Sequence, residues 1–403
     1  MKVIDIFKDL AKKVPRCSAD KSAMIDFLIA FAKKHSCTYK IDDIGNILLT
    51  KGNPKICLQA HYDIVCLNDG SSIEIVEENG WLKAKNSTLG ADNGIGIAMI
   101  LALFEEEYEI EALFTSDEEI GMLGARELNL EISSPYVLNL DSEEEGFVYV
   151  GCAGGFEIIA TKQLENSVFS DDGNIEQIKI NDLPGGHSGI DIDKEIPNAI
   201  IELLLKLKKT KSKIISFEGG EKLNSIPMNA VCEHIPNNSA SSELIDFLCS
   251  LPNGVIERNI DMGIPETSIN FAKLTVKDSI TTVQMYARSM DSLKMLELEN
   301  LLTRTFTRNG FEVKARGHYK PWEAKVNEFA QFVRNIMKKY FFTSGFKAIH
   351  AGLECGVLKE KMQNKQFASI GANIMSPHTL DERVEIVSVE KVYEALKDII
   401  RSA

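Results

Sequence analysis

Imidazole and carboxylate side chains occur at five places in the sequence where an apolar run gives way to polar residues or to a loop. These places hold His61 and Asp63 in LQAHYDIV, Asp92 in LGADNG, Glu118 and Glu119 in SDEEIG, Asp141 in NLDSEEEG, and His378 in SPHTLDERV. Imidazole nitrogen and carboxylate oxygen together suit zinc, cobalt or manganese. A carboxylate can bridge two such ions, and ions about 3.5–4 Å apart activate water for hydrolysis. The pattern therefore indicates a hydrolytic metal site.

Each of these residues also has a purely structural interpretation. Asp92 could cap the helix that follows it, since aspartate is favoured there. The two glutamates could form a solvated acidic turn, and a histidine at a strand end is often a hydrogen-bonded structural residue. The placement of all five segments at strand ends or in loops favours one shared metal site over five unrelated structural roles.

The adjacent glutamates Glu118 and Glu119 cannot both ligate a metal easily from one backbone direction. One of them is then a ligand, while the other faces water, takes its proton and delivers that proton to a leaving amine. Asp63 could hydrogen-bond the second imidazole nitrogen of His61 and fix its tautomer. The spacing alone leaves open which glutamate has which role.

The elements that must position these residues alternate between strands and helices in the first 155 residues. The sequence predicts strands at 46–50, 55–60, 110–115 and 136–140, and helices at 24–35 and from about residue 93. Such alternation implies an α/β domain with a mainly parallel sheet covered by helices on both faces. Ligands of such sheets collect beyond the carboxyl ends of the strands, where the polar residues fall.

The pattern of predicted strands and helices changes after the glycine-rich segment GCAGG at 151–155. Residues 156–318 predict an inserted α+β domain that contains strands, a helix at 197–209 and a helix at 295–306. The first pattern resumes at about residue 319, with a helix at 329–340, a strand at 366–370 and a helix at 389–400. We therefore expect a discontinuous catalytic domain, 1–155 and 319–403, interrupted by a lid domain.

The composition of the chain limits which classes of partner we expect. The chain has 403 residues, of which 44% are hydrophobic, and a formal net charge of -14. A strongly acidic surface repels phosphate backbones, so we expect no nucleic-acid partner. No apolar run approaches the roughly 20 residues that cross a bilayer, and the charged N-terminal segment predicts an amphipathic helix, not a signal peptide. We expect a cytoplasmic protein with no membrane partner.

The eight cysteines form no CxxC pair and lie at positions 17, 37, 57, 66, 152, 232, 249 and 355. In a chain of this length with no export signal, reduced thiols are expected rather than a disulfide framework. The acidic run Glu143–Glu145 is expected to be a solvated loop.

Motifs along nearly the whole chain resemble one enzyme family. They are LQAHYDIV, LGADNGIGIAM, TSDEEIGMLGA, NLDSEEEG, GCAGG, GGHSGIDI, HAGLECG and SPHTLDERVEI, in this order. The set resembles the di-zinc metallo-aminoacylase and carboxypeptidase family, and within it the aminoacyl-histidine dipeptidase branch (Xaa-His dipeptidase, cytosolic non-specific dipeptidase). GGHSGIDI and HAGLECG are the motifs most specific to the branch.

The resemblance implies two divalent metal ions per chain, zinc or alternatively cobalt or manganese, that share Asp92. His61 and Asp141 would complete one site, and Glu119 and His378 the other. It further implies that Asp63 orients His61 and that Glu118 is the general base and acid in the hydrolysis of a short peptide.

The inserted domain of the family is a lid that often mediates homodimer formation. His187 in GGHSG would stabilise the oxyanion, a role that commonly reaches across from the partner subunit, because negative charge develops on the carbonyl oxygen. Arg288 would grip the substrate carboxylate, Asn224 would contribute from the lid, and Glu354 would line the pocket near the substrate's amino end.

Several alternatives stay open. The lid segments DKEIPNAII and LNSIPMNA depart from the branch, which leaves a preference for histidine undecided. An N-acyl amino acid hydrolase or a tripeptidase could use the same scaffold, and a non-catalytic metal-binding homologue is a third alternative. A cysteine hydrolase with Cys66 or Cys355 as nucleophile lacks an evident histidine partner in the sequence.

Overall fold

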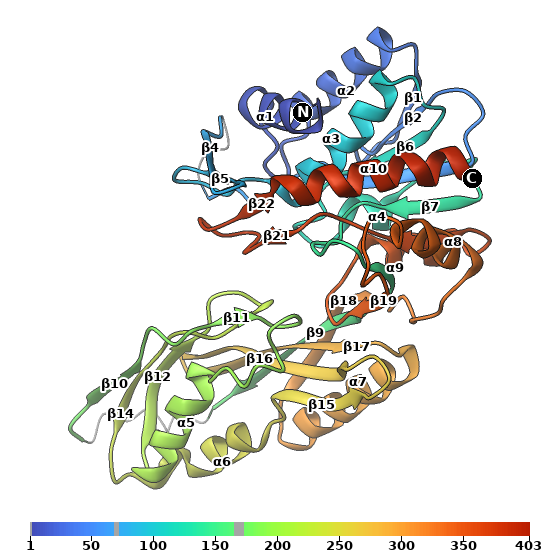
Figure 1. Ribbon diagram of the computed structural model, residues 1–403. Coiled ribbons are helices and arrows are strands. Elements are labelled where there is room, and N and C mark those ends of the chain that lie inside the picture. Colours follow the sequence, from blue (N-terminus) through green and yellow to red (C-terminus); the bar gives the residue numbers. More distant parts are fainter. Residues whose placement is uncertain (1, 68–71, 165–172) are drawn as a thin grey trace. The chain divides into compact units, whose positions relative to one another are not determined.

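The computed structural model describes residues 2–67, 72–164 and 173–403. The chain divides into two compact units, which Figure 1 labels by their helices and strands. Unit 1 comprises Met1–Gly151, Ala324–Ala348 and Leu353–Ala403, and unit 2 comprises Cys152–Glu323 and Ile349–Gly352. The short return of residues 349–352 to the second unit has no counterpart in the sequence-based division.

Unit 1 is built on an eight-stranded sheet with the order β1-β2-β6-β3-β7-β20-β8-β19. The four central strands β6, β3, β7 and β20 run parallel, whereas β1 with β2, β2 with β6, and β20 with β8 pair antiparallel. The expected α/β class is confirmed, with parallel pairing limited to the centre of a mixed sheet. The strands are β1 (Thr38–Ile41), β2 (Ile47–Thr50), β3 (Ile56–His61), β6 (Glu111–Thr115), β7 (Tyr136–Asn139), β8 (Val148–Cys152), β19 (Phe346–Ile349) and β20 (Gln366–Ser369).

Alternation along the strands decides what each sheet face packs against. Ile56, Leu58 and Ala60 of β3 belong to the main apolar core, which also takes the buried faces of α1, α2, α3, α8 and α10. Gln59 and His61 alternate with these residues and face the other side of the sheet, where α9 contacts β20 and α4. The helices are α1 (Lys2–Lys13), α2 (Ser22–Lys34), α3 (Ala91–Glu105), α4 (Leu123–Glu127), α8 (Glu328–Met337), α9 (Glu354–Lys361) and α10 (Ile386–Ser402).

Unit 1 also contains a small antiparallel sheet that the sequence analysis did not predict. Its order is β21-β22-β5-β4, and the loop between β21 and β22 carries His378. These strands are β4 (Ile75–Glu78), β5 (Trp81–Ala84), β21 (Ile374–Met375) and β22 (Arg383–Glu385). Their short length explains why no alternating pattern stands out in the sequence.

Unit 2 is an antiparallel sheet with the order β10-β14-β12-β16-β17-β9-β18, in which β15 also pairs with β16. The first strand, β9, lies between β17 and β18, the last two of this sheet along the chain. A second apolar core joins one face of this sheet to α5, α6 and α7. The strands are β9 (Gly154–Gln163), β10 (Glu176–Ile180), β12 (Lys213–Gly219), β14 (Ala230–Ile235), β15 (Gly254–Asn259), β16 (Ile264–Lys277), β17 (Ile280–Ser289) and β18 (Glu312–Tyr319).

The remaining elements of unit 2 include a two-stranded sheet of β11 (Gly186–His187) and β13 (Ser225–Ile226). The helices are α5 (Ala199–Lys209), the 3-10 turn η2 (Ser239–Ser241), α6 (Ser242–Ser250) and α7 (Ser292–Arg308). Within the described residues of both units, none of the helices is long and apolar enough to cross a membrane.

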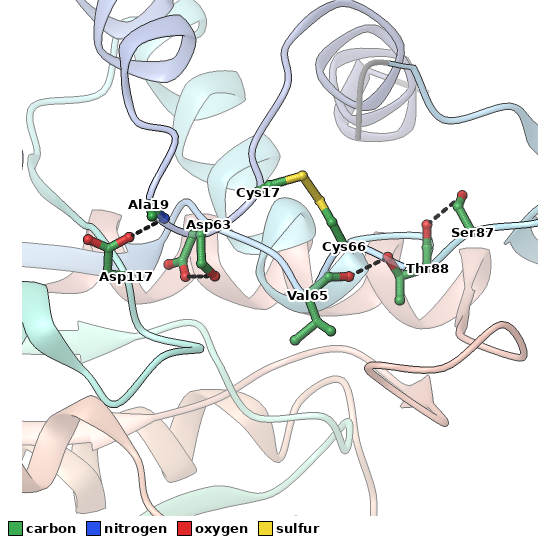
Figure 2. The surroundings of a disulfide bond; sticks show 9 residues. Cys17, Ala19, Asp63, Val65, Cys66, Ser87, Thr88 and Asp117 are labelled. Carbon is green, nitrogen blue, oxygen red and sulfur yellow. Dashed lines mark hydrogen bonds between the residues drawn. A yellow bond between two sulfur atoms is a disulfide. The ribbon is translucent and has the colours of Figure 1, made fainter. Parts of the chain in front are cut away.

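The structure contradicts the expectation that all eight cysteines are reduced. Cys17 and Cys66 form a disulfide with Cα atoms 5.4 Å apart (Figure 2). The bond joins the segment before α2 to the segment after β3, and Cys17 also forms a β-bridge with Ile64. The two cysteines are 49 residues apart, so their pairing is made by the tertiary fold and has no local signal. Cys66 is thereby removed as a candidate nucleophile, and Cys355 is fully buried.

The expectation of a solvated loop at Glu143–Glu145 is also wrong. All three residues are half-buried, and Lys347 Nζ donates to both carboxylate oxygens of Glu144 at 2.7 Å. The backbone N–H of Glu145 donates to Asn373 Oδ1 at 2.8 Å. Partners more than 200 residues away along the chain hold this acidic run in place, although the Glu144 side chain is 45% exposed.

We predict that opening the Cys17–Cys66 disulfide destabilises the protein. A cross-link that spans 49 residues removes about 4 kcal/mol of chain entropy from the unfolded state in the loop-entropy description. The Cys17→Ser variant, or wild type in a phosphine reductant, should therefore unfold at a lower temperature in circular dichroism. Cys249→Ser is the matched control, because Cys249 is a partly exposed thiol outside any disulfide. Identical melting of reduced and oxidised wild type would contradict the bond.

Candidate metal centre

The carboxyl ends of the parallel strands bring the predicted residues to one edge of the unit 1 sheet. His61 is the last residue of β3, Glu118 and Glu119 follow β6, and Asp141 follows β7. Because β6, β3 and β7 are neighbours that run parallel, their following segments emerge at the same edge. Asp92 lies at the start of α3, where its φ and ψ are not helical.

Two groups of side chains meet at this edge and share Asp92. In the first, His61 Nε2 lies 3.0 Å from Asp92 Oδ1 and 3.2 Å from Asp141 Oδ1. In the second, His378 Nε2 lies 3.1 Å from Asp92 Oδ2 and 2.8 Å from Glu119 Oε1. Within each group one ligand atom per residue lies within 4.8 Å of the others. The two oxygens of Asp92 thus face two different imidazoles.

The tautomer of His61 follows from its other ring nitrogen. His61 Nδ1 lies 3.0 Å from the main-chain oxygen of Asp63. A carbonyl oxygen only accepts, so Nδ1 carries a hydrogen, and the neutral form of this imidazole would have its lone pair on Nε2, at the shared edge. The structure places the Asp63 carboxylate farther from this nitrogen, with Oδ1 at 3.6 Å.

The Asp63 carboxylate instead holds the backbone of the glutamate turn. It accepts hydrogen bonds from Glu118 N at 2.9 Å, Glu119 N at 3.2 Å and Ser18 Oγ at 2.8 Å. Burial acts to raise the pKa of Asp63, but the interaction with His61 and these hydrogen bonds outweigh it and lower that pKa. Asp63 is therefore a fixed anion whose carboxylate holds the glutamate turn, while its main-chain oxygen contacts the imidazole.

The electrostatics of the edge favour a bound cation. Four carboxylates, those of Asp92, Glu118, Glu119 and Asp141, face two imidazoles in a largely buried setting. Burial raises the pKa of Glu118 well above its usual value and that of Glu119 to about 7. The buried carboxylates stabilise positive charge at this edge, since they raise the pKa of His61 and of His378 in spite of burial. Imidazole with carboxylate is also the donor set of zinc and similar divalent ions. The residues present fit a divalent cation in each of the two groups.

The two adjacent glutamates have different surroundings. Glu119 faces His378 and the shared Asp92. Glu118 forms no ion pair with an imidazole within 4.0 Å among the described residues, although it can join a group with His61 and Glu119. This contrast, which the sequence could not supply, distinguishes the two glutamates, and their separate roles stay predictions.

Unit 2 places His187 and Asn224 on neighbouring segments. His187 pairs with Ser225 across the small sheet of β11 and β13, and the carbonyl of exposed Asn224 accepts from Ser188 N at 2.8 Å. Gly189 N and Ile190 N donate to His187 Nδ1 at 3.2 and 3.1 Å. Since Nδ1 accepts, the neutral imidazole carries its hydrogen on Nε2 and is a donor at that atom.

Arg288, at the end of β17, is nearly inaccessible, with 4% of its surface exposed. Its Nη1 donates to Tyr319 Oη at 2.9 Å, and its Nη2 lies 3.5 Å from His187 Nε2. Nε has no hydrogen-bond partner, and no carboxylate pairs with the guanidinium among the residues that the structure describes. Two nitrogen donors therefore converge on one point of unit 2, an arrangement that suits an anionic oxygen.

Glu354, the first residue of α9, is completely buried on the face of the sheet opposite the main core. Its Oε2 accepts from Gln59 Nε2 at 2.5 Å and from Thr115 Oγ1 at 2.6 Å. Gln59 Oε1 in turn accepts from Asn139 Nδ2 at 2.6 Å. Burial raises the pKa of Glu354 to about 7. The network ties α9 to the three strands that end at the metal edge, and contact of Glu354 with substrate stays a prediction.

Sequence reasoning missed the polar residues that hold the ligands in place. Asn93 Nδ2 donates to Asp141 Oδ1, and Ser18 Oγ holds Asp63 from a segment that precedes α2. The position of Asn93 directly after Asp92 is a usable local signal. Ser18 has none, because its role depends on a contact 45 residues along the chain.

Comparison with known proteins supports the motif resemblance. Residues 57–402 match the profile of Peptidase family M20/M25/M40. The cytosol non-specific dipeptidase of Escherichia coli (strain K12) is 29% identical over 470 aligned positions, which cover 98% of this chain and 96% of that protein. The crystal structure of aminoacylhistidine dipeptidase from Vibrio alginolyticus is similar with a TM-score of 0.76 and 27% identity, over 100% of this chain and 96% of that one. A tripeptidase structure from Staphylococcus aureus, at 17% identity and a TM-score of 0.63, covers 99% of this chain and 97% of that one and shares the fold.

Proposed function

Because the chain belongs to Peptidase family M20/M25/M40 and is a metal-dependent peptide hydrolase, we propose that it is a dipeptidase of broad or Xaa-His specificity. The observation that carries the proposal is the position of Asp92 between two imidazoles, with the Glu118 carboxylate beside them. That arrangement is suited to two divalent ions per chain, zinc or alternatively cobalt or manganese.

We assign His61, Asp92 and Asp141 to one ion and Asp92, Glu119 and His378 to the other, as their grouping supports. When bound, such ions polarise the scissile carbonyl and lower the pKa of water. Glu118 then accepts the proton of the attacking water and passes it to the departing amine. Burial raises the pKa of Glu118 well above its usual value, so this carboxylate holds a proton more readily than an exposed glutamate does. Asp63 holds the glutamate turn in place during these transfers.

The donors of unit 2 are proposed to bind the substrate's oxygens. His187, a donor at Nε2, stabilises the oxyanion that develops on the former carbonyl oxygen. Arg288, buried and without a carboxylate partner in the described chain, binds the free C-terminal carboxylate and so restricts substrates to short peptides. Asn224 assists from the neighbouring segment, and Glu354 acts near the amino end of the substrate.

We further propose that the protein is a cytoplasmic homodimer that associates through unit 2. Leu293, Leu296 and Leu301 of α7 are 64%, 53% and 58% exposed, an apolar set that a second copy of the chain would cover. Light scattering should give twice the mass of one chain, and Leu293→Glu with Leu296→Glu should give a monomer. A monomeric wild type would contradict the dimer and leave the hydrolase proposal untouched.

A substrate panel tests the proposed function directly. The protein loaded with Zn²⁺, Co²⁺ or Mn²⁺ should hydrolyse carnosine, Ala-His or Leu-Gly faster than a tripeptide or an N-acetyl amino acid, and a chelator should abolish turnover. Turnover of the tripeptide alone, or of acetylated substrates alone, would replace the dipeptidase by the corresponding alternative. A folded, metal-loaded protein with no turnover of any substrate would indicate a non-catalytic homologue.

We predict that Glu118→Gln keeps the metal ions and loses turnover. Loss of a general base costs about 10²–10⁴-fold in rate, whereas the amide preserves the shape of the side chain. Elemental analysis and kcat on the best dipeptide check both halves of the prediction. Glu127→Gln is the control, because Glu127 is an exposed residue of nearby α4. Equal kcat for Glu118→Gln and wild type would assign the proton transfer to another group.

We predict that Arg288 selects substrates with a free carboxylate. Hydrogen bonds to a charged group contribute about 1.5–3 kcal/mol, so Arg288→Met should lower kcat/KM for a free dipeptide about 10- to 100-fold. The same variant should leave hydrolysis of the dipeptide amide nearly unchanged. Arg316→Met is the control, since Arg316 of unit 2 is 52% exposed and pairs with Glu157. An equal loss of kcat/KM for the free dipeptide and its amide would show that Arg288 does not recognise the carboxylate.

A further inference from the structure

A single buried carboxylate organises the turn that delivers Asp92. The backbone N–H groups of Leu89 and Gly90 donate to Glu382 Oε2 at 2.7 and 2.9 Å. Those of Ala91 and Asp92 donate to Glu382 Oε1 at 2.8 and 3.2 Å. Four consecutive amides thus point at one side chain from a segment 290 residues farther along the chain. Unpaired amides at the start of a helix form a site for an anion, and here the anion is part of the protein.

Arg16 fixes the same turn from its carbonyl side. Its side chain is 1% exposed, and Nη2 donates to the Gly90 carbonyl at 3.0 Å. Glycine is required at the two positions that face this guanidinium. A Cβ on Gly90 would lie 2.8 Å from Arg16 Nη2, and a Cβ on Gly94 would lie 2.9 Å from Nη1 and from Nη2. Gly90 also has a φ of +65°, where other residues are strained. The turn is therefore shaped to receive this guanidinium.

The charges of the two side chains are complementary. Burial lowers the pKa of Arg16 to about 10, although Glu382, Asp63 and Asp92 oppose that shift, so the group is a cation at neutral pH. The cation and the Glu382 carboxylate act on opposite polar groups of one short turn, its carbonyl and its amides. Two buried opposite charges that each hold the same turn are weak evidence for stability alone and are better evidence that one geometry is being specified.

We propose that Arg16 and Glu382 are positioning residues that set the Asp92 carboxylate between His61 and His378. The inference rests on the proposed function, because it assumes that Asp92 binds metal in both groups. Asp92 has its own amide on Glu382, so a change in that hydrogen bond acts on the residue whose two oxygens face the two imidazoles. Groups that orient metal ligands typically contribute 10- to 100-fold to metal affinity. Loosening the turn should weaken both metal sites together.

Glu111 supplies a matched control for a purely structural role. It is also 2% exposed and accepts three hydrogen bonds, from Ser133 N at 3.0 Å, Ser133 Oγ at 3.1 Å and Ser134 N at 2.9 Å. It is the first residue of β6, at the end of the strand opposite the metal edge. Loss of its charge should lower the stability of the protein without changing the positions of the metal ligands.

The test titrates Co²⁺ into metal-free wild type, Glu382→Gln, Arg16→Lys and Glu111→Gln, with the visible absorbance of bound Co²⁺ as the signal. Glu382→Gln and Arg16→Lys should need about 10- to 100-fold more Co²⁺ for half-saturation and show an altered spectrum. Glu111→Gln should melt at a lower temperature yet bind Co²⁺ with the wild-type affinity and spectrum. Circular dichroism on each sample establishes that the fold is present, and Arg16→Lys keeps the buried charge should Glu382→Gln fail to fold.

The outcomes distinguish a failure of the positioning role from a failure of the proposed function. Wild-type affinity and spectrum in folded Glu382→Gln or, if that variant does not fold, in Arg16→Lys would overturn the positioning role. The same weakening of affinity in Glu111→Gln as in Glu382→Gln would overturn it as well, by reducing it to general stability. A folded wild type that binds no Co²⁺, Zn²⁺ or Mn²⁺ would instead contradict the proposed function.

Discussion

The constraint on which unit 1 depends is that one carboxylate, that of Asp92, must face two imidazoles at once. Its oxygens lie 3.0 Å from His61 Nε2 and 3.1 Å from His378 Nε2. These residues come from a strand end, a helix start and a loop of the small sheet, so no local structure can bring them together. The parallel centre of the large sheet supplies the common edge, and the turn before α3 supplies the carboxylate. A displacement at any of the three would separate the groups.

Neighbours, more than residue type, differentiate the carboxylates at this edge. Asp63 is surrounded by donors, two backbone amides and the Ser18 hydroxyl, which hold it as an anion in spite of its burial. Among the residues that the structure describes, Glu118 has no comparable set of donors, and burial together with Glu119 and Asp141 raises its pKa. Glu382 also accepts hydrogen bonds from backbone amides, in its case the four amides of residues 89–92, which form the turn that carries Asp92. Hydrogen bonds to the charged form favour an anion and desolvation disfavours it. The hydrogen bonds and His61 outweigh burial at Asp63, whereas burial still raises the pKa of Glu382 and of Glu118.

The sequence predicted the parts of unit 1 that depend on local pattern. Apolar runs such as that of β3, followed at once by polar residues, predict both a buried strand and the place of His61 at its end. The residues that order these ligands were not predictable, because their partners are set by tertiary contacts. Glu382 meets the Asp92 turn from 290 residues away, and Cys17 meets Cys66 because the segments before α2 and after β3 lie side by side (Figure 2). The position of β9 between β17 and β18 likewise follows from strand pairing at long range. The hydrophobic periodicity of the sequence does not report which strands pair.

Arg288 is a buried cation in a chain that is acidic as a whole. With a formal net charge of -14, the chain as a whole repels an anionic peptide at long range, although salt screens that repulsion beyond about 10 Å. A free carboxylate must therefore be bound by a cation at contact distance. On the proposed function Arg288 meets this need, because it is buried, held by Tyr319 and without a carboxylate partner in the part of the chain that is described. The Tyr319 hydroxyl and the Tyr286 ring only partly replace the water that the buried guanidinium has lost, so a substrate carboxylate gains more there than on the surface. On the proposed function, the same unpaired charge that costs stability in the free protein is what restricts hydrolysis to peptides that end within reach of it.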